Sequence, residues 1–260
     1  MLLDHGDRAP WAVVLFHGLT NNPGQFRTLA PQIHALGANV YVPRMPFHGY
    51  ADRLTNALAG LRAEELVAQA AAAVDIARGL GERVAVLGIS MGGLQCAYLG
   101  AVRDDVAVSV PIAPDFSVLG LPAGVMAFVR SVVLALPNLF LWWDPRVREA
   151  MRPLTAYPRF CTHALMQTLR IGDTVRRLAY TTAPRASAIR TIVNRADPAV
   201  NNAVAHDIDR LWRSRRAAGI DYVEYADLPE NHDIIDPGNP MARTDIVYPR
   251  LIDALAIRTS

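Results

Sequence analysis

The sequence predicts an α/β fold in which a mostly parallel sheet is covered by helices on both faces. Three observations predict this class. Short β-branched runs alternate with longer helical stretches, these runs are continuously apolar, and the chain of 260 residues is 52% hydrophobic. Continuous apolar runs are typical of strands that have both faces covered, and a chain of this length can bury a sizeable core.

Six runs are predicted as strands because they are short, apolar and rich in β-branched or aromatic residues. They cover residues 11–16, 39–43, 83–88, 106–111, 189–194 and 221–226.

Helices are predicted between these runs. The clearest begins at Ala63 with an acidic first turn and ends at Gly81, where a C-terminal glycine cap is expected. The segments after Pro23 and after Ser90 also have helical patterns. Two further helices are expected at about 199–218 and 241–257.

One interval breaks the alternation. Residues 113–188 contain many prolines, several apolar helix-like pieces and no convincing strand. We therefore expect residues 1–112 and 189–260 to form the sheet domain, and residues 113–188 to form an inserted helical cap.

Part of this predicted cap is apolar enough to suggest a membrane span. The segment 119–143 is interrupted by Pro122, Arg130 and Pro137, however, so it is interpreted as a lid or a pocket wall without stable membrane insertion.

Charge and composition exclude several functions. The formal net charge is only +2, and no Lys/Arg run is interleaved with aromatic residues, so nucleic-acid binding is not expected. The first ten residues lack the pattern of a signal peptide, which predicts a cytoplasmic protein. Cys96 and Cys161 do not form a CxxC pair and are expected to be structural thiols.

The segment "VAVLGISMGG", residues 84–93, places a serine between glycines two positions away on either side. Ser90 follows a predicted strand and precedes a predicted helix, so it occupies a sharp turn. A Cβ at Gly88 or Gly92 would collide across such a turn. The turn holds the serine hydroxyl at the carboxyl edge of the sheet, where open α/β folds place their ligands.

A serine hydroxyl is a weak nucleophile that needs a base, and the base needs an orienting acid. His232, in "LPENHDIID", follows the last predicted strand and is the candidate base. Asp197 follows the preceding strand by three residues and is the candidate acid, while Asp115, just past the fourth strand, is its rival. The chain order Ser90, Asp197, His232 is one known solution to triad chemistry.

The oxyanion of a tetrahedral intermediate needs two backbone donors. The N–H of Met91, at the start of the helix after Ser90, is one candidate. The second is the N–H of Leu19 in "FHGLTNNP", where Gly18 lets the chain turn.

The remaining histidines are expected to have structural rather than catalytic roles. His17 is expected to brace the oxyanion loop through backbone hydrogen bonds, and His48 to stabilise its own loop in the same way. No spacing of histidines and carboxylates indicates a metal site, so no metal is predicted.

The motifs "HGLT", "GISMGG", "ADPAV" and "NHD" resemble those of the bacterial carboxylesterase and monoacylglycerol lipase group of the α/β-hydrolases, and the resemblance covers the whole chain. It implies an α/β-hydrolase fold with a cap over an acyl pocket, and ester hydrolysis without a cofactor. Carried over by position, it makes Ser90 the nucleophile, Asp197 the acid, His232 the base, and Leu19 and Met91 the oxyanion donors.

The sequence departs from the pattern of this group at two places. Only sixteen residues precede His17, so the usual N-terminal strand pair is missing or reduced to a short edge. Phe47 occupies a position where glycine is usual, and we expect its ring to shape the pocket entrance. Met126 and Val129, in the predicted cap, are expected to line the acyl pocket.

These observations predict a serine hydrolase that cleaves small-molecule carboxylic esters of short to medium acyl chain. A thioesterase, an amidase or a C–C bond hydrolase would use the same triad, and a non-catalytic binding protein with this fold is the alternative of another class. The sequence leaves the oligomeric state open.

Overall fold

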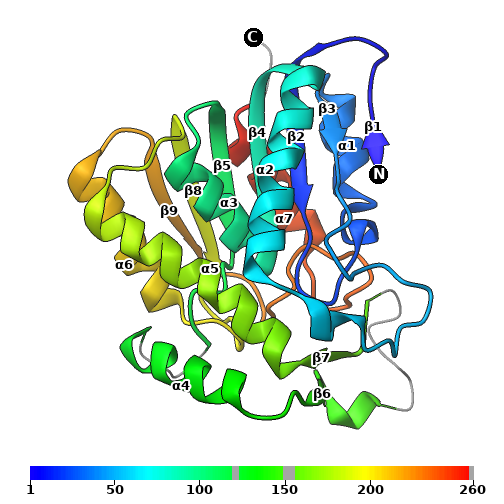
Figure 1. The fold of residues 1–260 in the computed structure, drawn as a ribbon. Helices are drawn as coiled ribbons and strands as arrows, with labels where there is room; N and C mark the ends of the chain where they lie inside the picture. The colour runs from blue at the N-terminus through cyan, green and yellow to red at the C-terminus, as the bar shows by residue number, and fades with distance from the viewer. Residues whose placement is uncertain (119–122, 149–155, 258–260) are drawn as a thin grey trace.

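A seven-stranded sheet forms the centre of the computed structural model, which describes residues 1–118, 123–148 and 156–257 (Figure 1). The order of the strands is β1-β3-β2-β4-β5-β8-β9, and all neighbours are parallel except β1 and β3. The predicted fold class is therefore confirmed. The strands are β1 (Leu2–Leu3), β2 (Ala9–Phe16), β3 (Asn39–Tyr41), β4 (Gly81–Ile89), β5 (Val106–Ile112), β8 (Ala188–Asn194) and β9 (Ile220–Tyr225).

Helices cover the sheet on both faces (Figure 1). One apolar cluster joins α1 and α7 to the sheet, and a second joins α2, α3, α5 and α6 to it. Successive residues of β2 alternate between the two clusters, with Val13 and Leu15 in one and Val14 and Phe16 in the other. This alternation explains why the strand is continuously apolar. The helices are α1 (Leu29–Ala35), α2 (Ala63–Leu80), α3 (Met91–Val102), α5 (Thr162–Thr181), α6 (Asn202–Arg215) and α7 (Thr244–Leu255).

Two predicted helix features differ from the structure. The helical segment after Pro23 is divided into a short 3-10 helix, η1 (Pro23–Phe26), and α1. Gly81 is not a left-handed cap, because its φ of −147° is extended and it begins β4 directly. Glycine is needed there for close approach, since an added Cβ would overlap the backbone nitrogen of Ala12.

The segment between β5 and β8 contains α4 (Ala123–Ala135), β6 (Phe140–Trp142), η3 (Pro145–Val147), β7 (Arg159–Cys161) and α5. The expectation that it holds no strand is wrong, because β6 and β7 form an antiparallel pair. Figure 1 shows α4, β6 and β7 beyond the end of the sheet towards which β2 points. Another 3-10 helix, η2 (Ala57–Gly60), precedes α2.

This inserted segment is not a wholly separate layer. Ile171, Val175 and Ala179 of α5 belong to the same core cluster as α3. Pro122, which interrupts the apolar part of the predicted cap, lies outside the described residues. Within the described ranges no helix combines the length and the apolar character that crossing a membrane requires.

The amino-terminal part contributes only a minimal edge to the sheet. β1 has two residues and pairs with β3 through Leu2 and Leu3. β1 is therefore a short edge strand. Cys96 and Cys161 are buried free thiols, as predicted.

Candidate active site

Ser90 occupies the turn between β4 and α3 in a backbone conformation that serine rarely adopts, with φ 58° and ψ −116°. Its N–H donates a hydrogen bond of 2.9 Å to the carbonyl oxygen of Ile112 on the neighbouring strand. A Cβ on Gly88 would lie 2.5 Å from the carbonyl oxygen of Gly92, and a Cβ on Gly92 would overlap the carbonyl oxygen of Phe16. Both glycines are therefore sterically required, as the motif predicted.

Asp197 and His232 are joined by a hydrogen bond. The Nδ1–H of His232 donates to Oδ2 of Asp197 over 2.7 Å. The other carboxylate oxygen accepts the N–H groups of Ala199 at 2.8 Å and Val200 at 3.2 Å. The Asp197 side chain is 0% exposed and that of His232 is 26% exposed, so the acid is buried and the imidazole reaches the surface of the site. With Nδ1 donating, Nε2 of the neutral ring is free to act as a base.

The charges around His232 favour its protonated form. Burial lowers the pKa of His232, but the hydrogen bond to Asp197 and the charges of Asp197, Asp115 and Asp233 outweigh burial, so the pKa lies above 6.5. Asp115 is buried close enough to sense His232 and Asp197. Burial raises the pKa of Asp115 to about 6, the His232 charge opposes this rise, and the Asp197 charge adds to it. The hydrogen bond of His232 goes to Asp197 and not to its rival.

The loop after β2 lies beside Ser90 because β2 and β4 are paired up to their carboxyl ends, where Phe16 is opposite Gly88. A Cβ on Gly18 would lie 3.7 Å from the Cβ of Ser90. Leu19 follows Gly18 directly and is buried. Met91 is the first residue of α3, where N–H groups have no acceptor inside the helix.

Two side chains that sequence reasoning missed hold this loop. The N–H of Gly18 donates to Oε1 of Gln25 over 2.9 Å, and Nε2 of Gln25 donates to Oδ2 of Asp233 over 2.8 Å. Asp233 directly follows His232, so Gln25 connects the loop after β2 to the loop that carries His232. Gln25 belongs to no motif and its partner is distant in sequence, so no pattern in the sequence pointed to it.

As predicted, Nδ1 of His17 donates to the carbonyl oxygen of Gly18 over 2.9 Å, and Nδ1 of His48 donates to that of Pro46, in its own loop, over 2.7 Å. Each ring also bonds the other loop. The Met45 N–H donates to Nε2 of His17 over 3.2 Å, and the Thr20 N–H donates to Nε2 of His48 over 3.1 Å. Burial, with a smaller effect of the neighbouring His48 charge, lowers the pKa of His17 to about 3, and burial lowers the pKa of His48 to about 4. Both rings are therefore neutral at physiological pH and can accept these bonds.

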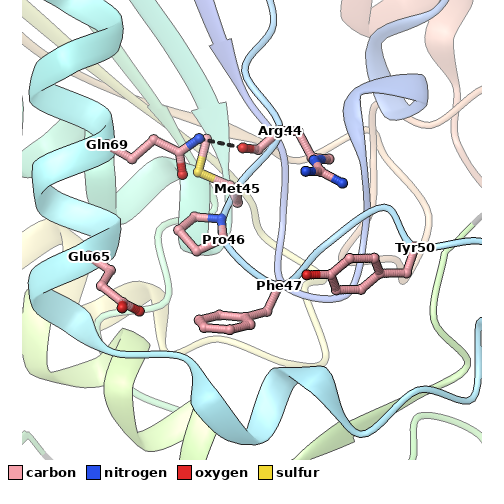
Figure 2. Close-up of a pocket in the computed structure, with 7 residues that line it drawn as sticks. All are labelled: Arg44, Met45, Pro46, Phe47, Tyr50, Glu65 and Gln69. Atoms are coloured by element: carbon pink, nitrogen blue, oxygen red, sulfur yellow. Dashed lines mark hydrogen bonds between the residues drawn. The ribbon is translucent and has the colours of Figure 1, made fainter.

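The three predicted substrate-binding residues lie in two places. Phe47 lines a surface pocket formed by the loop after β3 and by Glu65 and Gln69 of α2, as Figure 2 shows. Its ring is also 3.1 Å from where a Cβ of Gly60 would be. The full lining of this pocket in the described residues is Arg44, Met45, Pro46, Phe47, Tyr50, Glu65 and Gln69, and includes none of the five predicted catalytic and oxyanion residues.

Met126 and Val129 lie on α4. Met126 is buried in a small cluster with Met166 and Leu169 of α5, and Val129 packs against this cluster. The described contacts of both residues are thus with the α4–α5 interface, and their predicted part in an acyl pocket stays a prediction.

Comparison with known proteins finds a family model, one curated relative and solved structures that are similar to this chain. A family model described as the alpha/beta hydrolase family matches residues 13–241. The thermostable monoacylglycerol lipase of Bacillus sp. (strain H-257) is 26% identical over 175 residues, which is 64% of this chain and 64% of the lipase. The match therefore spans less than two thirds of that relative.

Solved structures share the fold over nearly the whole chain. The Paleococcus ferrophilus monoacylglycerol lipase has a TM-score of 0.73 at 18% identity, with 100% of this chain and 99% of that chain covered. A structure described with LipS and LipT, two metagenome-derived lipolytic enzymes, has a TM-score of 0.71 at 18% identity, with 98% and 96% covered.

Proposed function

This chain belongs to the alpha/beta hydrolase family, and we propose that within this family it is a serine esterase acting on small carboxylic esters of short to medium acyl chain. The observation that carries the proposal is the 2.7 Å hydrogen bond between His232 and Asp197 at the carboxyl edge of the sheet, where Ser90 occupies its strained turn. Catalysis of this kind needs a base held in one tautomer by a buried acid. The lipolytic relatives support ester chemistry.

In the proposed mechanism, Oγ of Ser90 attacks the ester carbonyl carbon while Nε2 of His232 accepts the hydroxyl proton. The N–H groups of Leu19 and Met91 bind the oxyanion of the tetrahedral intermediate. The intermediate collapses to an acyl-serine and an alcohol, which takes the proton from His232. A water molecule, deprotonated by the same imidazole, then releases the carboxylic acid and restores Ser90.

Asp197 has two tasks in this scheme. Its Oδ2 keeps the proton of His232 on Nδ1, so that Nε2 keeps the lone pair that accepts the hydroxyl proton, and its charge stabilises the imidazolium that forms. The Ala199 and Val200 N–H groups fix the carboxylate in turn. The neutral rings of His17 and His48 hold the oxyanion loop without adding positive charge.

The proposal is tested by turnover of p-nitrophenyl esters with acyl chains of about C2 to C16, beside thioester and amide analogues. Labelling of Ser90 by a fluorophosphonate probe is expected, and Ser90→Ala is the control. Folded protein that neither labels nor turns over an ester would contradict the proposal and favour the non-catalytic binding protein.

The pH profile of kcat/KM is expected to have a rising limb with its midpoint above pH 6.5, because the pKa of His232 is raised and only the neutral imidazole accepts a proton. Activity should be lost as the pH falls through that pKa. A rate series on p-nitrophenyl butyrate measures this limb. A midpoint at or below 6.5 would contradict the charge environment described for His232.

Acyl-chain length is expected to have a bounded optimum. A closed apolar pocket gains about 0.8 kcal/mol per buried CH₂ only until it is full. We predict that kcat/KM peaks at roughly four to eight acyl carbons and falls beyond them. The p-nitrophenyl series measures this profile, and a rate still rising at the longest chain would show an open groove.

Phe47→Gly is expected to move this optimum towards longer or bulkier esters. Phe47 has a φ of 63°, a conformation that glycine adopts without strain, so the loop should keep its path. Phe47→Leu is the matched control that keeps an apolar side chain. An unchanged profile in Phe47→Gly would show that the ring acts only in the surface pocket of Figure 2.

A further inference from the structure

Thr20, the residue after the proposed oxyanion donor Leu19, is held through all of its polar groups. It is a β-branched residue with φ 69°, a conformation that such residues avoid, and it is only 4% exposed. Its N–H donates to Nε2 of His48 over 3.1 Å, and its hydroxyl donates to the carbonyl oxygen of Leu19 over 2.5 Å. The path of the chain at Leu19 therefore depends on contacts made by Thr20.

Two further contacts to Thr20 come from the inserted segment. The indole Nε1–H of Trp143, just after β6, donates to Oγ1 of Thr20 over 2.8 Å. The N–H of Tyr157 donates to the carbonyl oxygen of Thr20 over 2.8 Å. Because the Thr20 hydroxyl uses its one proton on Leu19, its remaining lone pairs are what Trp143 binds.

Trp143 is not buried as a core residue would be. The residue is 45% exposed, and its ring stacks on Phe160 of β7 with the ring centres 4.2 Å apart. The indole nitrogen is the only hydrogen-bonding group of its side chain, and this group reaches inward to a buried hydroxyl. A purely apolar role on the surface would not require that bond.

We propose that Trp143 is a positioning residue for the oxyanion hole, an inference that rests on the proposed esterase function. Leu19 is fixed on both sides: the Gly18 N–H is held by Gln25, and the Leu19 carbonyl is held by the Thr20 hydroxyl that Trp143 binds. The inserted segment thereby sets the direction of the Leu19 N–H. If β6 moved away from Thr20, the Leu19 N–H would be held less firmly in the direction that stabilises the transition state.

The loss of kcat expected when the Trp143 N–H is removed lies between two limits. Loss of one neutral hydrogen bond would lower kcat by a factor of about two to twelve. Complete loss of an oxyanion donor would lower it by about 10² to 10³. Trp143→Phe keeps the aromatic ring and removes only the N–H. We expect it to lower kcat about tenfold on every acyl length while KM changes less than about twofold.

The matched control is Trp142→Phe. Trp142 is the adjacent residue, half-buried, with the guanidinium of Arg148 over its ring. This variant should keep the wild-type kcat. Thr20→Val, which keeps the branched shape but removes the hydroxyl, should also lower kcat, and Trp143→Phe should add little to it if both act through one contact.

Two readouts test the inference. The first is kcat with the inhibition constant of phenylboronic acid, whose tetrahedral adduct imitates the oxyanion; this constant should rise in parallel with the loss of kcat. The second is amide hydrogen exchange over residues 17–22, which needs no substrate and should be faster in Trp143→Phe than in Trp142→Phe.

Three outcomes would overturn the inference: equal exchange in the two variants, an effect confined to KM, or losses of kcat that multiply in the double variant of Thr20→Val and Trp143→Phe. If the wild-type protein turns over no ester, the proposed function fails, and the exchange experiment alone decides whether Trp143 orders the loop.

Discussion

Ser90→Ala and His232→Ala are each expected to reduce kcat on p-nitrophenyl esters by about 10⁶, to near the background rate. The reason is that the two side chains act in one step: without the imidazole the hydroxyl stays protonated, and without the hydroxyl the imidazole has nothing to activate. The double variant should be little worse than either single variant, because removing one member already removes the function of the other.

Matched controls separate this loss from unfolding. Ser214→Ala changes a serine of α6 whose hydroxyl donates to the Leu211 carbonyl oxygen, and His206→Ala changes a histidine of α6 that packs edge-on against Tyr222. Both should keep turnover. Losses that multiply in the Ser90/His232 double variant would show that the residues act independently.

Asp197→Asn is expected to lower kcat by about 10⁴. Asparagine keeps the shape of the side chain, but its amide lacks the charge that stabilises the imidazolium, and it can hold the ring in the wrong tautomer. The rising limb of the pH profile should also move to lower pH, because Asp197 is the main group that raises the pKa of His232.

Asp115→Asn is the comparison that decides between the two acids. The charge of His232 affects the pKa of Asp115, yet the hydrogen bond of the imidazole goes to Asp197. We expect Asp115→Asn to change kcat less than about tenfold. A larger loss in Asp115→Asn than in Asp197→Asn would move the role of the acid to the loop after β5.

The fold class and the candidates for the site could be predicted from the sequence. The strands were recognisable because the sheet has two covered faces, so that each strand is apolar at consecutive positions, as in Val13 and Val14. The elbow was recognisable because Gly88 and Gly92 leave no room for a Cβ. Asp197 and His232 follow consecutive strands, and neighbouring parallel strands bring such loops together.

Other features depend on contacts that no local pattern encodes. Gln25 meets Asp233, and Trp143 meets Thr20, across long separations in sequence, and each bond is a single side-chain contact without periodicity. β6 and β7 have three residues each, too few for an alternation to be visible. Glycine is favoured both by a left-handed turn at a helix end and by crowding against a neighbouring strand. Gly81 therefore has the sequence pattern of a helix cap, although crowding is the reason for it here.

The backbone of Ser90 has a consequence for how this protein can evolve or be engineered. A non-glycine residue held in such a conformation costs of order 1–3 kcal/mol, against a total stability of about 5–15 kcal/mol for a typical domain. Glycine would relieve this strain but would remove the hydroxyl. The most stable sequence for this turn and the sequence proposed to be catalytic therefore differ at residue 90, so a screen for thermal stability alone would select against the nucleophile.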